Sequence, residues 1–115
     1  PGDSETCAKI MVGASLLGGL DVAISHSVVN LAGQLSPLES AALMAGAVLN
    51  FVNDSGPLHL ASAVNAPTCA VFCSTVPDFG YGPLADFSRI VQIESPLHCR
   101  PCGLHGHKKC PEGHF

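Results

Sequence analysis

The sequence is poor in charge. Only 12% of its 115 residues are Asp, Glu, Lys or Arg, and the formal net charge is -4. Because nucleic-acid binding needs a strongly basic surface, this balance excludes a general nucleic-acid-binding protein. The 47% of hydrophobic residues also exclude a disordered segment. The length suits one domain. The scarcity of polar surface indicates either that an apolar face packs against something outside the chain or that the chain is part of a larger body.

Long apolar runs are lacking too. No run reaches the ~18 residues of a membrane-spanning helix, since glycines and Asp21 interrupt the richest stretch, residues 10–24. That stretch has no basic segment before it, so we expect no signal peptide. The chain begins with Pro1 instead of Met, and we therefore expect a fragment of a longer protein. The six cysteines are not spaced as in a small secreted scaffold, which favours a reducing, cytoplasmic compartment.

Repeats are absent, and instead apolar strands alternate with helices. We expect helices over residues 5–17, 37–46 and 58–64, and strands over residues 27–32, 48–52, 68–73 and 88–93. Residues 18–26 fit either type. The helix from residue 37 has the clearest start, because Ser36-Pro37-Leu38-Glu39 is a capping box with proline at the first helical position. Continuously apolar strands between helices predict an α/β fold, a parallel sheet with helices on both faces.

A turn follows the strand expected over residues 48–52. Ligands of open parallel sheets bind at the carboxyl ends of the strands. Here Asp54 or Ser55 can cap the next helix, Gly56 admits a ligand close to the backbone, and the free amides at the helix start favour a phosphate. His59 lies one turn further on. Alternatively, the two polar residues only cap the helix and His59 is an interfacial histidine. Neither GxGxxG nor a P-loop is present, so no motif establishes a generic nucleotide fold.

Two blocks carry a resemblance to a known family. They are Leu-Ala-Gly-Gln-Leu-Ser-Pro-Leu-Glu at 31–39 and Asn-Asp-Ser-Gly-Pro-Leu-His-Leu-Ala at 53–61. With Ala66-Pro67-Thr68 and a Cys-Arg-Pro-Cys run, they make residues 27–115 similar to the carboxyl-terminal half of a bacterial heptosyltransferase, of glycosyltransferase family 9. The resemblance implies the C-terminal half of a GT-B fold, whose two Rossmann-like domains face a cleft. Residues 1–97 would be part of the nucleotide-sugar-binding domain, and residues 98–115 a Cys/His-rich tail of it.

The resemblance also implies an activity, the inverting transfer of heptose from ADP-heptose to the lipopolysaccharide core. By position, Ser55 and Gly56 would present amides to the donor pyrophosphate, and Asp54 would bind sugar hydroxyls. His59 would contact the sugar-phosphate region, and Leu35 would lie against the adenine or ribose. We expect no cofactor for catalysis, and a cytoplasmic enzyme, with a peripheral site on the inner membrane as an alternative.

Two features of the family have no counterpart in the chain. The catalytic aspartate belongs to the N-terminal domain, and a lysine-containing donor loop begins the second domain. We therefore assign no catalytic residue here and expect the isolated chain to be inactive. Two other functions stay open, a GT-B sugar-nucleotide epimerase and a non-catalytic, zinc-stabilised α/β binding module.

The last 18 residues are rich in Cys and His. The pattern C-x2-C-x7-C-x3-H, formed by Cys99, Cys102, Cys110 and His114, can supply four ligands for a tetrahedral zinc ion. The alternatives are free thiols, one disulfide, or a ligand set completed beyond Phe115, because a second CxxC or an HxxxH is missing. The other cysteines, Cys7, Cys69 and Cys73, are expected to be small buried hydrophobes.

Two further features of the sequence have open roles. The basic side chains near the end, Arg100, Lys108 and Lys109, favour a solvated tail over contact with an anionic ligand or a membrane surface. In the long loop over residues 74–87, Phe79 and Tyr81 either anchor the loop or pack on the donor base or sugar.

Overall fold

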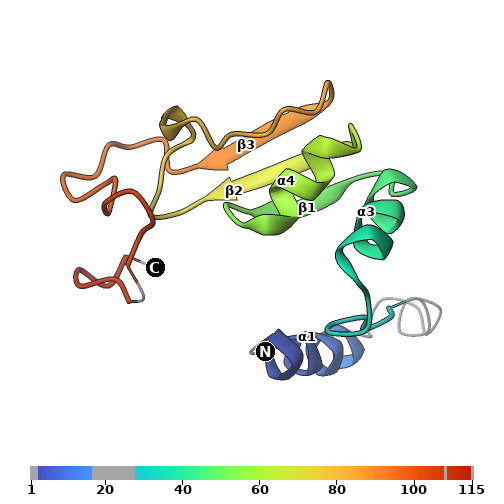
Figure 1. The fold of residues 1–115 in the computed structure, drawn as a ribbon. Helices are drawn as coiled ribbons and strands as arrows, with labels where there is room; N and C mark the ends of the chain where they lie inside the picture. The colour runs from blue at the N-terminus through green and yellow to red at the C-terminus, as the bar shows by residue number, and fades with distance from the viewer. Residues whose placement is uncertain (1–2, 17–27, 108, 115) are drawn as a thin grey trace. The chain divides into compact units, whose positions relative to one another are not determined.

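The computed structural model describes residues 3–16, 28–107 and 109–114 (Figure 1). Its contacts divide the chain into two units, Pro1–Leu38 and Glu39–Phe115. The segment over residues 98–114 thus belongs to the same unit as the sheet. The predicted boundary at residue 97 stays a prediction.

The first unit contains α1 (Asp3–Leu16), which confirms the helix expected over residues 5–17. The strand expected over residues 27–32 is wrong for residues 28–32, which form no strand; Ser27 and residues 18–26 lie outside the described residues. The reason is Asn30, whose side-chain Oδ1 accepts the backbone N–H of Ala32 at 3.0 Å. Such a bond holds the backbone in a turn and competes with strand pairing. Gly33 lies in this turn, with φ +75°.

Helix α3 (Pro37–Ala45) begins at the predicted proline and ends just before Gly46. The backbone N–H of Gly46 closes its end on the Leu43 carbonyl oxygen at 3.2 Å. Most residues of this helix are apolar. Only Ala41 is buried, however, and Leu43 is 56% exposed. Most of the apolar surface of α3 is therefore uncovered in the described part of the chain.

The second unit is built on three strands, β1 (Asn50–Asn53), β2 (Thr68–Phe72) and β3 (Ser88–Gln92). They pair in parallel in the order β1-β2-β3, with Val52, Ala70 and Ile90 in register (Figure 1). Helix α4 (Gly56–Ala63) connects β1 to β2 and packs on both. The predicted α/β fold with a parallel sheet is confirmed, and its architecture is Rossmann-like.

The core lies between α4 and one face of the sheet. It consists of Val52, Leu58, Ala70 and Phe72. The opposite face bears Phe51, which is 75% exposed, and the exposed side chains of Val71 and Val91. Within the second unit, α4 is the helix that packs on the sheet, and the layer of helices expected on the second face stays a prediction.

Asn50 determines where the sheet begins, two residues later than expected. Its backbone N–H donates to the Pro67 carbonyl oxygen at 2.8 Å. Its side-chain Nδ2 donates to the carbonyl oxygens of Met44 and Pro67 at 3.1 and 3.0 Å. Val48, in contrast, is 95% exposed. Asn50 thereby joins the end of α3 to the starts of β1 and β2.

None of the helices in the described residues has the length and apolar character that crossing a membrane requires.

Candidate functional site

The turn between β1 and α4 is built as the sequence predicts, with one exception. Ser55 occupies the N-cap position with extended backbone, and Pro57 lies in the first turn. The exception is that the Ser55 hydroxyl makes no capping bond. It donates instead to Asn53 Oδ1 at 2.7 Å. The start of α4 therefore has no side-chain cap from Ser55.

Asp54 is held by a residue that follows the neighbouring strand. The hydroxyl of Thr75 donates to Asp54 Oδ2 at 2.5 Å. Thr75 is buried and Asp54 is half-buried. A hydroxyl group has a single proton to donate, and here Asp54 accepts it, which holds the carboxylate at the carboxyl end of the sheet.

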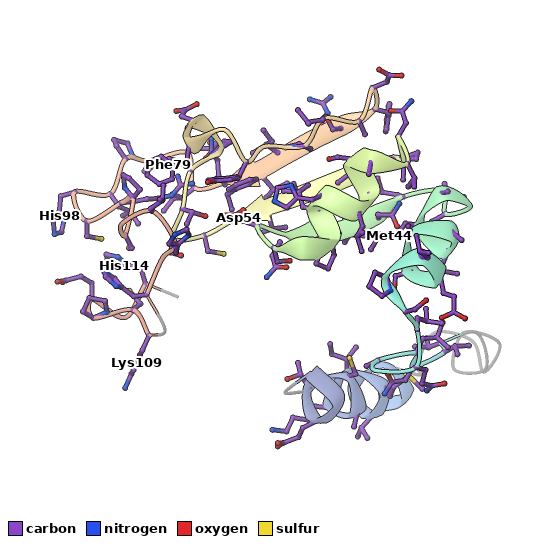
Figure 2. All side chains as sticks on the ribbon, viewed as in Figure 1. Met44, Asp54, Phe79, His98, Lys109 and His114 are labelled. Atoms are coloured by element: carbon purple, nitrogen blue, oxygen red, sulfur yellow. The ribbon has the colours of Figure 1, made fainter. Side chains whose placement is uncertain are left out.

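A pocket of about 130 Å³ opens at this end of the sheet. It is lined by Asn53, Asp54, Val71, Cys73, Ser74, Thr75 and His105. Figure 2 shows Asp54 on the side of the sheet from which the tail residues His98 and His114 extend. Three of the lining residues, Ser74, Thr75 and His105, were missed by the sequence reasoning. A signal existed for the first two, because they directly follow β2 and so reach the same sheet edge as Asp54.

An apolar groove of about 330 Å³ adjoins the polar pocket. It is lined by Met44, Phe51, Val52, Asn53, Pro57 and Val71. Asn53 and Val71 belong to both hollows. The polar pocket thus continues into the apolar groove beside the start of α4.

The tail docks on the carboxyl ends of the strands. The backbone N–H of Cys102 donates to the Ser74 carbonyl oxygen at 2.8 Å. Arg100 Nη2 donates to the Thr75 carbonyl oxygen at 2.7 Å and to Gln92 Oε1 at 2.8 Å. The expectation of a solvated basic end is thus wrong for Arg100, since carbonyl acceptors at the sheet edge bind its guanidinium. Lys109 is exposed, as expected.

The sequence model of glycosyltransferase family 9 (heptosyltransferase) matches residues 14–114. The chain belongs to this family. The resemblance noted in the sequence is therefore confirmed, and the parallel sheet with its helices is part of a Rossmann-like half of a GT-B glycosyltransferase.

Two curated relatives of this family 9 chain are heptosyltransferases. Over 82 residues it is 34% identical to lipooligosaccharide heptosyltransferase 2 of Haemophilus influenzae, covering 71% of the chain and 23% of the relative. Over 69 residues it is 33% identical to lipopolysaccharide heptosyltransferase 2 of Escherichia coli K12, covering 60% of the chain and 20% of the relative. The matched part thus spans under a quarter of either relative's length. No solved structure gives a significant match.

The predicted donor-site residues of the family 9 chain lie in two units. Asp54, Ser55, Gly56 and His59 are together at the turn and first part of α4. Leu35 belongs to the first unit, where it is half-buried just before α3. Its contact with the adenine or ribose stays a prediction.

The aromatic residues of the long loop have structural contacts. The ring of His59, exposed on α4, lies edge-on to the ring of Tyr81, with centroids 6.2 Å apart. Phe79 is half-buried in the short 3-10 helix η1 (Pro77–Phe79). The contact with His59 favours the anchoring role for Tyr81, and the role of Phe79 stays a prediction.

All six cysteines lie among the described residues, and none of them forms a disulfide bond. The expected burial is wrong for Cys73, which is exposed because it lies beyond the end of β2 at the pocket. Cys7 and Cys69 are only half-buried. A disulfide, one of the alternatives for the tail, is not formed.

The four candidate metal ligands of the tail are neighbours. Cys99 Sγ lies 3.5 Å from His114 Nδ1, and the His114 backbone N–H donates to Cys110 Sγ at 3.2 Å. Burial raises the pKa of the Cys102 thiol, the thiols of Cys99 and Cys110 raise it further, and Arg100 lowers it. Across residues 3–16, 28–107 and 109–114, no three His, Cys, Asp or Glu side chains are already arranged to hold a metal ion.

Proposed function

We propose that this chain is the nucleotide-sugar-binding part of a heptosyltransferase. The donor would be ADP-heptose and the acceptor the lipopolysaccharide core. Support comes from family membership and from the heptosyltransferase names of both relatives. We place the enzyme in the cytoplasm, peripheral to the inner membrane.

The pocket at the carboxyl end of the sheet is the observation that carries the proposal. Its Asp54 carboxylate, fixed by Thr75, is an acceptor for sugar hydroxyl groups. The start of α4 has no cap from the Ser55 side chain, and a helix start attracts a phosphate through its backbone amides and its dipole. A Cβ on Gly56 would meet nothing within 4 Å, so a ligand has open space beside this backbone.

The other donor contacts follow from what surrounds this turn. The amides of Ser55 and Gly56 would bind the pyrophosphate, and His59 the sugar-phosphate region. The adjoining apolar groove suits a less polar part of the donor, and His105 adds a ring nitrogen to the pocket wall.

The chemistry proposed is a single displacement with inversion. The acceptor oxygen attacks the anomeric carbon, and the nucleoside diphosphate leaves with the bonding electron pair. This chain's backbone amides would stabilise the negative charge that develops on the leaving group. The base that takes the acceptor proton would come from an N-terminal domain, so the purified 115-residue chain should transfer no heptose. Measurable transfer by that chain would contradict this assignment.

Calorimetric titration with ADP, ADP-heptose and UDP tests the donor site. We expect ADP and ADP-heptose to bind, and Asp54→Ala and Gly56→Trp to abolish binding. Asp78→Ala, which removes an exposed carboxylate of η1, is the control and should bind normally. A preference for UDP would support a sugar-nucleotide epimerase instead, and no affinity for any nucleotide would overturn the proposal.

A further inference from the structure

Two turns of the tail each carry a pair of metal-ligating side chains. Cys99 and Cys102 form the first pair, three residues apart. Cys110 and His114 form the second, on a turn closed by a bond from the Gly113 N–H to the Cys110 carbonyl oxygen at 3.4 Å. Gly113 has φ +70°, which glycine adopts without strain. Each turn therefore presents two ligands on a short piece of backbone.

The two turns meet at a distance that suits a metal ion. Zinc bonds of about 2.3 Å to sulfur and about 2.0 Å to nitrogen, at a tetrahedral angle, place the two ligand atoms about 3.5 Å apart. Cys99 Sγ and His114 Nδ1 are separated by 3.5 Å. These two atoms, which also lie within hydrogen-bonding distance of each other, thus have the spacing of two ligands of one zinc ion.

The remaining two sulfur atoms have hydrogen bonds that fit a metal-free site. Cys110 Sγ accepts the backbone N–H of His114 at 3.2 Å, a contact that also stabilises a metal-bound thiolate. Cys102 Sγ donates to the Cys99 carbonyl oxygen at 3.4 Å. No three His, Cys, Asp or Glu side chains among the described residues are already placed to hold a metal ion. Zinc binding therefore requires the Cys102 sulfur to leave this carbonyl oxygen and turn toward the other three ligands.

We propose that Cys99, Cys102, Cys110 and His114 together bind one structural zinc ion. On binding, three thiol protons pass to solvent and three sulfur–zinc bonds form, while neutral His114 donates its Nδ1 lone pair. The resulting centre has a net charge of -1. Arg100, next in sequence to Cys99 and bound to the sheet edge, supplies a compensating positive charge.

The ion would hold one wall of the pocket in place. The peptide N–H of Cys102 is bonded to Ser74, and His105 lines the pocket beside Asp54. Zinc binding at Cys102 and Cys110 would close the loop that carries His105. The inference concerns metal content and does not depend on which nucleotide sugar the protein binds.

Metal analysis of protein prepared without a histidine tag is the direct test. We expect about one zinc ion per chain. After exchange for Co²⁺, we expect the intense visible bands of a tetrahedral site and sulfur-to-cobalt charge transfer in the near ultraviolet. Cys99→Ser, Cys110→Ser and His114→Ala should each lose most of the bound zinc. Cys73→Ser and His107→Ala, which change an exposed thiol and an exposed imidazole outside the set, should keep it.

The outcomes separate this inference from the proposed function. Zinc far below one per chain in the unaltered protein, without cobalt bands, would overturn it even if ADP binds normally. So would full zinc content in Cys99→Ser. The cobalt spectrum of the unaltered protein keeps the test decisive if a variant fails to fold. Full zinc content without nucleotide affinity would overturn the donor site alone.

Discussion

Thr75 donates its hydroxyl to the carboxylate of Asp54 across a sequence separation of 21 residues, at 2.5 Å. Asp54 follows β1 and Thr75 follows β2, and the two strands pair in parallel. The bond therefore connects two neighbouring strand ends at the pocket. It makes the orientation of the proposed sugar-binding carboxylate depend on a residue outside the motif that contains it.

Thr75→Val should weaken both stability and donor binding. Valine has the shape of threonine but offers no donor, so an oxygen of the half-buried Asp54 carboxylate loses its partner. Hydrogen bonds to charged groups contribute about 1.5–3 kcal/mol, and we expect a loss of this size in the free energy of unfolding, measured in urea. ADP-heptose affinity should fall with it. Thr75→Ser keeps the hydroxyl and should retain most of both, whereas equal losses in the two variants would contradict the role of the hydroxyl.

The packing of Gly106 against Ser74 gives a second prediction. A Cβ on Gly106 would come within 2.5 Å of Ser74 Oγ, and its φ is +71°. Gly103 has nearly the same φ, +70°, but open space around it. Gly103→Ala should thus cost only the backbone strain, about 1–2 kcal/mol, and Gly106→Ala clearly more. Adding Ser74→Ala to Gly106→Ala should recover part of the difference in unfolding free energy; no recovery would mean that Ser74 is not the obstacle.

The order of the helices and strands in the second unit could be predicted from local signals. Ser36-Pro37 marks the start of α3, and the apolar run at residues 68–73 marks β2. Where the prediction fails, the cause is an interaction that the pattern of hydrophobic residues does not reveal, either between neighbours in the sequence or between residues far apart in it. At residues 28–32 the Asn30 side chain bonds to the backbone and replaces a strand by a turn. The approach of His105 to Asp54 depends on contacts more than 50 residues apart, which no local motif specifies.

Asn65 and Asp86 make a reciprocal pair that joins the end of α4 to the loop before β3. Asn65 Nδ2 donates to Asp86 Oδ2 at 2.8 Å, and the Asp86 backbone N–H donates to Asn65 Oδ1 at 2.9 Å. Asn65 also has a positive φ of 51°. Asn65→Gly relieves the strain but removes both bonds, whereas Asn65→Ala removes both and keeps the strain.

We therefore expect Asn65→Ala to be the less stable variant, by about 1 kcal/mol relative to Asn65→Gly. Asn65→Asp retains the acceptor for the Asp86 N–H but puts two carboxylates in contact, so its stability should improve as the pH falls toward 4. Thermal unfolding at several pH values measures all three. A pH-independent Asn65→Asp would contradict the pairing.

Arg100 ties the tail to the sheet through a planar guanidinium that reaches the Thr75 carbonyl oxygen and Gln92 Oε1 together. A lysine ammonium has no such fork, so Arg100→Lys should loosen the tail while keeping its charge. We expect faster hydrogen exchange at the Cys102 amide, which is bonded to the Ser74 carbonyl oxygen, and a loss of about 1–3 kcal/mol of stability. Arg89→Lys, on an exposed position of β3, is the matched control. If both variants exchange alike, the guanidinium does not hold the tail.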